Sequence, residues 1–290
     1  MNSPVATGPP RTFGPPTGAP AGWYPDPYGH VSARYYDGRR WTPYTTYDPR
    51  QPFVDASQQD HPVLPFPVVV GAIFILFVSL VTQRQLIDNL VDRDWNVLIY
   101  MLLSAAVGYG PSVLWIWFVS RRWGTGRPFV DLGVRFRWQD LGWGPVIWIS
   151  THIAVVIVVV AMEAFDVPYR GNLEAQTTTS PERTAVISLI ISAVVFAPIV
   201  EEALFRGVVM RGLLSKTAPA IAIGIQGVLF GAAHFQPDYG RESIGLIIAL
   251  SVAGVGFGFG CYLLRRLGPV IIAHACFNAL AIGVLLVRAY

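Results

Sequence analysis

Residues 200–207 read Val-Glu-Glu-Ala-Leu-Phe-Arg-Gly, and they place three charged side chains at the end of an apolar run of membrane length. Charge near a bilayer core is costly, so an ionisable side chain there indicates a functional site. On a helix, Glu202 and Arg206 are four residues apart and can form an ion pair. Glu201 lies about 100° around the helix from Glu202, so its carboxylate stays available. The stretch therefore predicts one structural glutamate and one that is free for chemistry.

The composition indicates a membrane protein. The chain has 290 residues, of which 53% are hydrophobic and 13% are charged, and this charged share is about half that of soluble domains. The arginines lie between apolar runs and form no continuous stripe, which argues against nucleic-acid binding. Cys261 and Cys276 both lie in apolar segments, so neither a disulfide framework nor a cysteine-rich zinc site is expected.

The apolar runs predict an all-α polytopic membrane domain over residues 62–290 with about seven transmembrane helices, because a bilayer core needs about 20 apolar residues per span. Arginines gather in the 121–140 loop, whereas the 84–94 and 164–182 loops are rich in acids. By the positive-inside rule, this predicts an integral protein of the cell membrane with a cytoplasmic N-terminus. We expect helices at 65–83, 95–120, 141–163, 183–214, 218–236, 243–264 and 267–288.

The N-terminal part differs in kind. Residues 1–20 are rich in Pro and Gly and are expected to be disordered. Asp37-Gly38 between aromatic residues predicts a small aromatic hairpin within 21–45, followed by a polar linker over 46–61. We interpret the hairpin as a small tethered module, and a peptide-binding role stays open. It resembles the DUF2510 module of membrane proteins in two fragments, Gly22-Trp23-Tyr24-Pro25-Asp26-Pro27 and Arg34-Tyr35-Tyr36-Asp37-Gly38-Arg39-Arg40-Trp41-Thr42.

Two later fragments carry polar residues of the kind used for proton transfer or metal binding. Phe230 and His234 end one apolar segment, and His274 and Asn278 open the last one. Each pair is four residues apart and shares a helical face. On straight helices the two histidines would lie at unequal depths. For them to meet, the helices must be tilted, short or broken near 235–240.

The order Glu-Glu-x-x-x-Arg, Phe-x-x-x-His and His-x-x-x-Asn resembles the CPBP intramembrane proteases, the CAAX-protease and bacteriocin-processing family also called Abi. The resemblance covers residues 131–287. It implies an intramembrane endopeptidase in which the first glutamate and the second-motif histidine activate water, while the last pair holds the oxyanion. Carried over, the catalytic residues are Glu201, His234, His274 and Asn278, with Glu202 and Arg206 in support.

Peptide hydrolysis needs an activated water, an oxyanion stabiliser and a proton for the leaving amine, and a carboxylate and an imidazole can share the acid–base work. If Glu201, His234 and His274 act together, we expect their functional atoms within about 8 Å of one another. The same three residues could hold a divalent metal such as zinc, although the His-Glu-x-x-His signature is absent. Glutamate-dependent and metal-dependent hydrolysis therefore both stay open. The expected partners are membrane lipid and a peptide or membrane-protein substrate, with no nucleic acid.

Two other functional classes stay open. A polytopic transporter with a buried proton relay would show inverted repeats or paired broken helices, and the sequence shows no internal repeat. A non-proteolytic membrane scaffold or immunity protein would keep the fold without the activity. His152 is interpreted as a hydrogen-bonding link between helices. Gly254, Gly256, Gly258 and Gly260 form two overlapping Gly-x-x-x-Gly pairs and are expected to let neighbouring helices pack closely.

Overall fold

The computed structural model describes residues 19–25, 33–46, 64–90, 97–171 and 183–289. The chain divides into two compact units, residues 1–60 and 61–290, and each is described by itself. Most of the segment predicted to be disordered, and nearly all of the predicted linker, lie outside the described residues.

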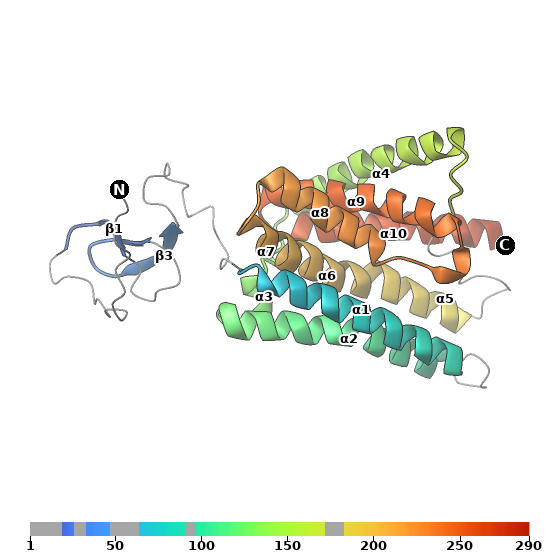
Figure 1. The fold of residues 1–290 in the computed structure, drawn as a ribbon, viewed down its shortest axis with the longest axis horizontal. Helices are drawn as coiled ribbons and strands as arrows, with labels where there is room; N and C mark the ends of the chain where they lie inside the picture. Colours follow the sequence, from blue (N-terminus) through green and yellow to red (C-terminus); the bar gives the residue numbers. More distant parts are fainter. Residues whose placement is uncertain (1–18, 26–32, 47–63, 91–96, 172–182, 290) are drawn as a thin grey trace, which may run out of the picture. The chain divides into compact units, whose positions relative to one another are not determined.

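The N-terminal unit contains a three-stranded antiparallel sheet in the order β1-β2-β3, with β1 at Gly22–Pro25, β2 at Ala33–Tyr36 and β3 at Trp41–Thr46 (Figure 1). The predicted hairpin is present between β2 and β3, and β1 adds a strand to it. Gly38 has a φ of 90°, which a glycine adopts readily. The side chain of Asp37 accepts the main-chain N–H groups of Arg39 and Arg40, both at 2.8 Å.

Aromatic side chains form the small core of this sheet. Tyr36 is buried, and its ring centroid lies 5.5 Å from that of Trp41. Tyr24 meets both rings edge to face, at 6.3 and 6.2 Å. The rings of Trp23 and Tyr35 also meet edge to face, at 5.4 Å. A core this small gives marginal stability.

The second unit is helical, and its long helices run side by side (Figure 1). Within the described residues of this unit, six helices are long and apolar enough to cross a membrane, and a seventh apolar helix, α8, has only 14 residues. This agrees with the predicted number of apolar segments, apart from the length of α8. The elements are α1 (Pro67–Leu90), α2 (Val97–Trp123), the short α3 (Pro128–Asp131), α4 (Asp140–Ala164), a helix over 183–214, α8 (Pro219–Ala232), α9 (Glu242–Leu264) and α10 (Gly268–Ala289).

The prediction that the fifth helix continues to residue 236 is wrong, because α8 ends at Ala232. The N–H of His234 bonds to the carbonyl of Gly231 at 3.0 Å, and that of the next residue bonds three residues back at 3.1 Å. Such bonds tighten the chain into a turn. Pro237 then keeps Gln236 extended, with φ −116° and ψ 100°, because the residue before a proline avoids the helical region. His234 therefore follows a short helix. This agrees with the expectation that a short or broken helix would be needed for His234 and His274 to reach the same depth.

The surface of the membrane unit is apolar, as α1 illustrates. Val70, Phe74 and Phe77 are exposed, and their spacing places them on one side of the helix. Val68 and Ala72 are fully buried. In water an exposed apolar stripe would be a liability, whereas in a bilayer it is the lipid-facing surface.

The glycines of α9 bring its backbone close to two different helices. A Cβ atom at Gly254 would lie 2.8 Å from the Cα of Gly227 in α8, and one at Gly256 would lie 2.4 Å from the Oγ1 of Thr151 in α4. The glycines four residues further on repeat this pattern against α8 and α4, respectively. The predicted packing role is confirmed, and the two Gly-x-x-x-Gly pairs serve separate interfaces.

Asp131 organises the loop between α2 and α4. Its carboxylate accepts hydrogen bonds from the Ser120 hydroxyl, from the N–H and hydroxyl of Thr125, and from the N–H of Arg127. Burial would raise the pKa of Asp131, but these hydrogen bonds outweigh burial and hold its pKa below the ordinary value. Its main-chain carbonyl accepts from Arg211 at 2.6 Å. The loop thereby holds the end of the helix that carries the Glu-Glu motif described first.

Candidate active site

The helix over 183–214 changes pitch four times as it passes the site. It comprises α5 (Arg183–Ile190), the π-helix η3 (Ile191–Phe196), α6 (Ala197–Glu202), the π-helix η4 (Ala203–Met210) and α7 (Arg211–Leu214). π-Helical turns are rare in proteins overall, and those that occur are often found at functional sites. Both glutamates of the first motif lie in the six-residue α6 between the two π-helices.

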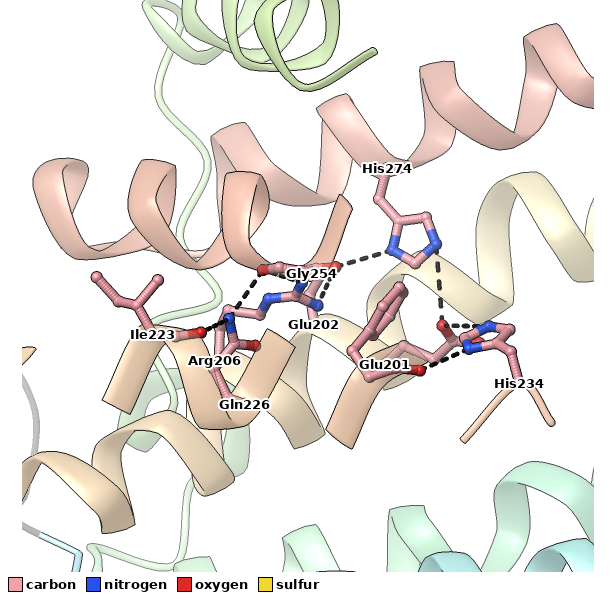
Figure 2. A network of polar contacts seen from close by, with 9 residues as sticks. Glu201, Glu202, Arg206, Ile223, Gln226, His234, Gly254 and His274 are labelled. Carbon is pink, nitrogen blue, oxygen red and sulfur yellow. Dashed lines mark hydrogen bonds and ion pairs between the residues drawn. The ribbon is translucent and has the colours of Figure 1, made fainter. Parts of the chain in front are cut away.

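Glu201 faces both histidines (Figure 2). Its Oε2 atom lies 3.9 Å from Nε2 of His234 and 3.8 Å from Nε2 of His274. Both imidazoles therefore lie within 4 Å of one carboxylate oxygen, and the expected convergence is confirmed. The side chains of Glu201 and His234 keep 17% and 19% of their surface exposed, against 5% for His274, so the side of the cluster at His234 is the more open one.

The other ring nitrogens fix the tautomers. Nδ1 of His234 lies 2.8 Å from the carbonyl oxygen of Phe230, and because a carbonyl can only accept, Nδ1 carries the hydrogen. Nδ1 of His274 lies 2.8 Å from Oε1 of Glu202 and donates to it in the same way. In the neutral rings both Nε2 atoms are then acceptors that face the carboxylate of Glu201. Among the described residues, Oε2 of Glu201 has no hydrogen-bond partner. Three acceptors facing one another suit a water molecule, which supplies two donors.

Glu202 and Arg206 form the predicted ion pair. Nη1 of Arg206 lies 2.8 Å from Oε1 of Glu202, and both side chains are fully buried. Nη2 donates to the carbonyl of Gly254 at 3.0 Å. The guanidinium also lies 4.7 Å from the ring centre of Phe230 and 5.5 Å from that of Phe257. The buried cation is thus matched by a carboxylate, a carbonyl and two ring faces, and the carboxylate in turn orients His274.

Gln226 is a member of this network that the sequence reasoning missed. It is fully buried, and its Nε2 donates to the carbonyls of Ile223 and Gly254, at 3.0 and 2.8 Å (Figure 2). It precedes Phe230 by four residues and His234 by eight, which places it on the same face of α8 as Phe230. A lone amide in an apolar segment is the signal that could have identified it.

The segment after α8 that begins with His234 is held at both of its sides. Arg84 of α1 donates from Nη1 and Nη2 to the two carboxylate oxygens of Asp238, at 2.6 and 3.0 Å. The hydroxyl of Tyr239 donates to the carbonyl of Gly171 at 3.1 Å. These contacts restrict the turn on which the second-motif histidine stands.

Two predicted polar residues make contacts other than those expected. Nδ2 of Asn278 donates to the main-chain carbonyl of Ala193 at 2.7 Å, so its amide nitrogen contacts η3. Its oxyanion role stays a prediction. Nδ1 of His152 has no hydrogen-bond partner among the described residues, and its ring centroid lies 5.6 Å from that of Phe277. The link between α4 and α10 at this point is therefore an aromatic contact.

The three residues proposed as metal ligands have the right chemistry for zinc but not the right spacing. Glu201, His234 and His274 offer atoms that zinc accepts, and the hydrogen bonds at both Nδ1 atoms are of the kind that orient metal-bound histidines. Within the part of the chain that the structure describes, however, no group of three or more His, Cys, Asp or Glu side chains could hold a metal ion. The separations of 3.8 and 3.9 Å exceed the ~3.3 Å that tetrahedral zinc bonds of 2.0–2.1 Å imply. The residues as placed do not fit a zinc ion.

Comparisons with known proteins support the motif assignment. Residues 183–280 match the family model described as Type II CAAX prenyl endopeptidase Rce1-like, and this segment contains all seven residues named in the three motifs. Residues 21–54 match the model of DUF2510, a protein of unknown function. No curated protein and no solved structure matched the chain. The two resemblances predicted from the sequence are confirmed, and the membrane unit is similar, at the family level, to CAAX-type intramembrane endopeptidases.

Proposed function

We propose that this chain is an intramembrane endopeptidase that hydrolyses a peptide bond in a membrane-associated or peptide substrate. The observation that carries the proposal is the position of the Glu201 carboxylate, with its Oε2 atom 3.9 Å from His234 and 3.8 Å from His274. The hydrogen bonds at both Nδ1 atoms leave the Nε2 atoms for chemistry. A structural cluster would have no need of three acceptors that face one another.

In the proposed reaction a water molecule lies among these acceptors. Its oxygen attacks the carbonyl carbon of the substrate while one proton passes to Glu201. The second hydrogen stays on the attacking oxygen, and Nε2 of His234 accepts a hydrogen bond from it and orients the attack. The electron pair of the carbonyl moves onto its oxygen and gives a tetrahedral oxyanion. Glu201 then delivers its proton to the leaving nitrogen, the carbon–nitrogen bond breaks, and a carboxylic acid and an amine are released.

The oxyanion formed in this step needs hydrogen-bond donors, and we propose His274 and Asn278 for this role. Before the reaction Nε2 of His274 is an acceptor for the water, and because its Nδ1–H is committed to Glu202, Nε2 can become a donor to the oxyanion only after the ring takes up a second proton. The second amide hydrogen of Asn278 is the other proposed donor, and losing a donor of this kind typically lowers the rate by ~10²–10³.

We propose the glutamate-dependent route, because the three donor residues do not fit a zinc ion as they are placed. It predicts that extensive dialysis against a chelator leaves cleavage unchanged. Recovery of lost cleavage by added zinc, but not by magnesium, would instead assign the reaction to the metal-dependent route. In the cell membrane we place the N-terminus in the cytoplasm, as the arginines of the 121–140 loop indicate.

The test is a comparison of new protein termini in membranes of cells that express wild-type protein or a single Glu→Gln variant. Glu201→Gln removes the proposed base, whereas Glu163→Gln makes the same change at an exposed position of α4. The proposal expects a set of termini that appears with the wild type and with Glu163→Gln but not with Glu201→Gln. Identical termini in all three samples, at equal protein levels, would refute it.

A further inference from the structure

Asn278 contacts the main chain of the helix that carries Glu201. Its Nδ2 atom lies 2.7 Å from the carbonyl oxygen of Ala193, in η3, about two turns before Glu201. His274, one turn earlier on α10, binds Glu202 at 2.8 Å. His274 and Asn278 of α10 therefore hold this helix at two points, one before and one after Pro198.

The carbonyl of Ala193 lacks its ordinary partners within the helix. In an α-helix it would accept the N–H of residue 197, but the N–H of Ala197 bonds to the carbonyl of Ser192. In a π-helical turn the donor would be residue 198, which is a proline and has no N–H. A main-chain carbonyl without a partner is especially costly in a bilayer, where water cannot replace the bond. The amide of Asn278 supplies the donor that Pro198 withholds.

We propose that Asn278 is a positioning residue, which satisfies the carbonyl that Pro198 leaves free and so fixes the rotation of α6 that turns Glu201 toward the histidines. The proposal rests on the proposed function, because it assigns a use to the orientation of Glu201. One residue of register rotates a helix by about 100°. Without Asn278, the helix could satisfy the carbonyl of Ala193 by changing from π-helical to α-helical hydrogen bonds. That change of register would rotate the Glu201 carboxylate away from His234 and His274.

The experiment is a double-mutant cycle on the full-length protein, measured by kcat/KM and by melting temperature. Asn278→Leu keeps a similar volume without a donor, and Asn278→Ala replaces it if leucine does not fit. Pro198→Ala restores the N–H that can reach the carbonyl of Ala193. We expect the factor lost from kcat/KM on Asn278→Leu to be at least about fivefold smaller in the Pro198→Ala background, which is the low end of the effect of one unsatisfied buried polar group. The drop in melting temperature should shrink in parallel.

A proline elsewhere in the membrane unit is the matched control. Pro111 lies inside α2, and Pro111→Ala should leave the effect of Asn278→Leu unchanged. The pH profile adds a second readout, because the acid limb of kcat/KM reports the base of the free enzyme. Loss of a positioning residue should shift that limb, whereas loss of an oxyanion donor alone should lower the rate at every pH.

The outcomes separate this inference from the proposed function. The positioning role would be overturned if Asn278→Leu lowered kcat/KM and the melting temperature equally in the wild-type and Pro198→Ala backgrounds and left the acid limb of the pH profile unshifted. The proposed endopeptidase activity would be unaffected by that result. If wild-type protein cleaves nothing, the proposed function fails. Coupling in the melting temperatures would then still establish the bond to Ala193, whereas additive melting temperatures would refute it too.

Discussion

Replacing each of the two adjacent glutamates by glutamine should have different effects on stability. Oε1 of Glu202 accepts from Arg206 and from His274, both at 2.8 Å, in a fully buried position. Glu202→Gln keeps the volume but leaves the cation unpaired, and breaking a buried ion pair costs about 3–5 kcal/mol. The ring contacts of the guanidinium with Phe230 and Phe257 remain in the variant. We therefore expect a loss at the low end of this range, about 3 kcal/mol, or roughly 10 °C in melting temperature.

Glu201→Gln should instead abolish cleavage and leave the melting temperature within about 3 °C of wild type, because Oε2 of Glu201 has no partner among the described residues. Thermal unfolding in one detergent, followed by tryptophan fluorescence, gives the stability, and cleavage of a substrate found among the new termini gives the activity. Glu163→Gln is the control for both. Equal melting temperatures for the two motif variants, or near-normal cleavage by Glu201→Gln, would refute the division of roles between the glutamates.

Gly231→Ala should lower the melting temperature and the activity, because its Cβ would lie 2.3 Å from main-chain and hydroxyl oxygens of α9. Gly283→Ala is the control, since nothing lies within 4 Å of that position, and it should be neutral or slightly stabilising. Equal effects of the two substitutions would contradict the close packing of α8 on α9. Deletion of residues 1–61 should leave membrane insertion and cleavage of a short reporter peptide intact, because the helices satisfy their own backbone hydrogen bonds; loss of insertion would make the N-terminal part necessary to the fold. The lowered pKa of Asp131 means that its hydrogen bonds stabilise the protein above the ordinary pKa of about 3.9 and that this contribution is lost as the pH falls through the lowered folded-state pKa. The difference in melting temperature between wild type and Asp131→Asn should therefore be largest near neutral pH and vanish in strong acid, and a difference that grows on acidification would contradict the sign.

The helices could be predicted from the sequence because an apolar run of membrane length has few other structures available to it. The exact end of α8 could not, since a break near 235–240 was expected on account of the depth mismatch, but the sequence did not show that the helix ends before His234. The helix ends there because the turn at His234 and the restriction imposed by Pro237 determine the backbone. The π-helices on either side of α6 were equally hidden. They depend on how Pro198 is accommodated against α10, which is a matter of packing and not of local pattern.

The convergence of Glu201 with the two histidines could be predicted from the motifs, although a count of depths along straight helices argued against it. That count failed because it assumed a full-length α8. The link from Glu202 to His274, and the place of Gln226 beside Gly254, could not be predicted. They depend on which helices are neighbours, and a single sequence does not state this. The residue types identified the reactive groups. Which partners their remaining polar atoms bind, such as the Nδ1 atoms of the two histidines, depends on the packing of the helices.

The brevity of α8 has a consequence for the lipid around it. Its 14 residues span about 21 Å at 1.5 Å per residue, against a hydrocarbon thickness of about 30 Å. Ile221, Ile225 and Val228 are exposed, so this helix meets the acyl chains directly. A hydrophobic stretch shorter than the bilayer is accommodated by thinning of the bilayer, by snorkelling of flanking residues or by oligomerisation. Thinning would bring the lipid headgroups and their water toward the end of α8, next to the proposed active site. For the proposed endopeptidase we therefore predict a rate that depends on the acyl-chain length of the surrounding lipid.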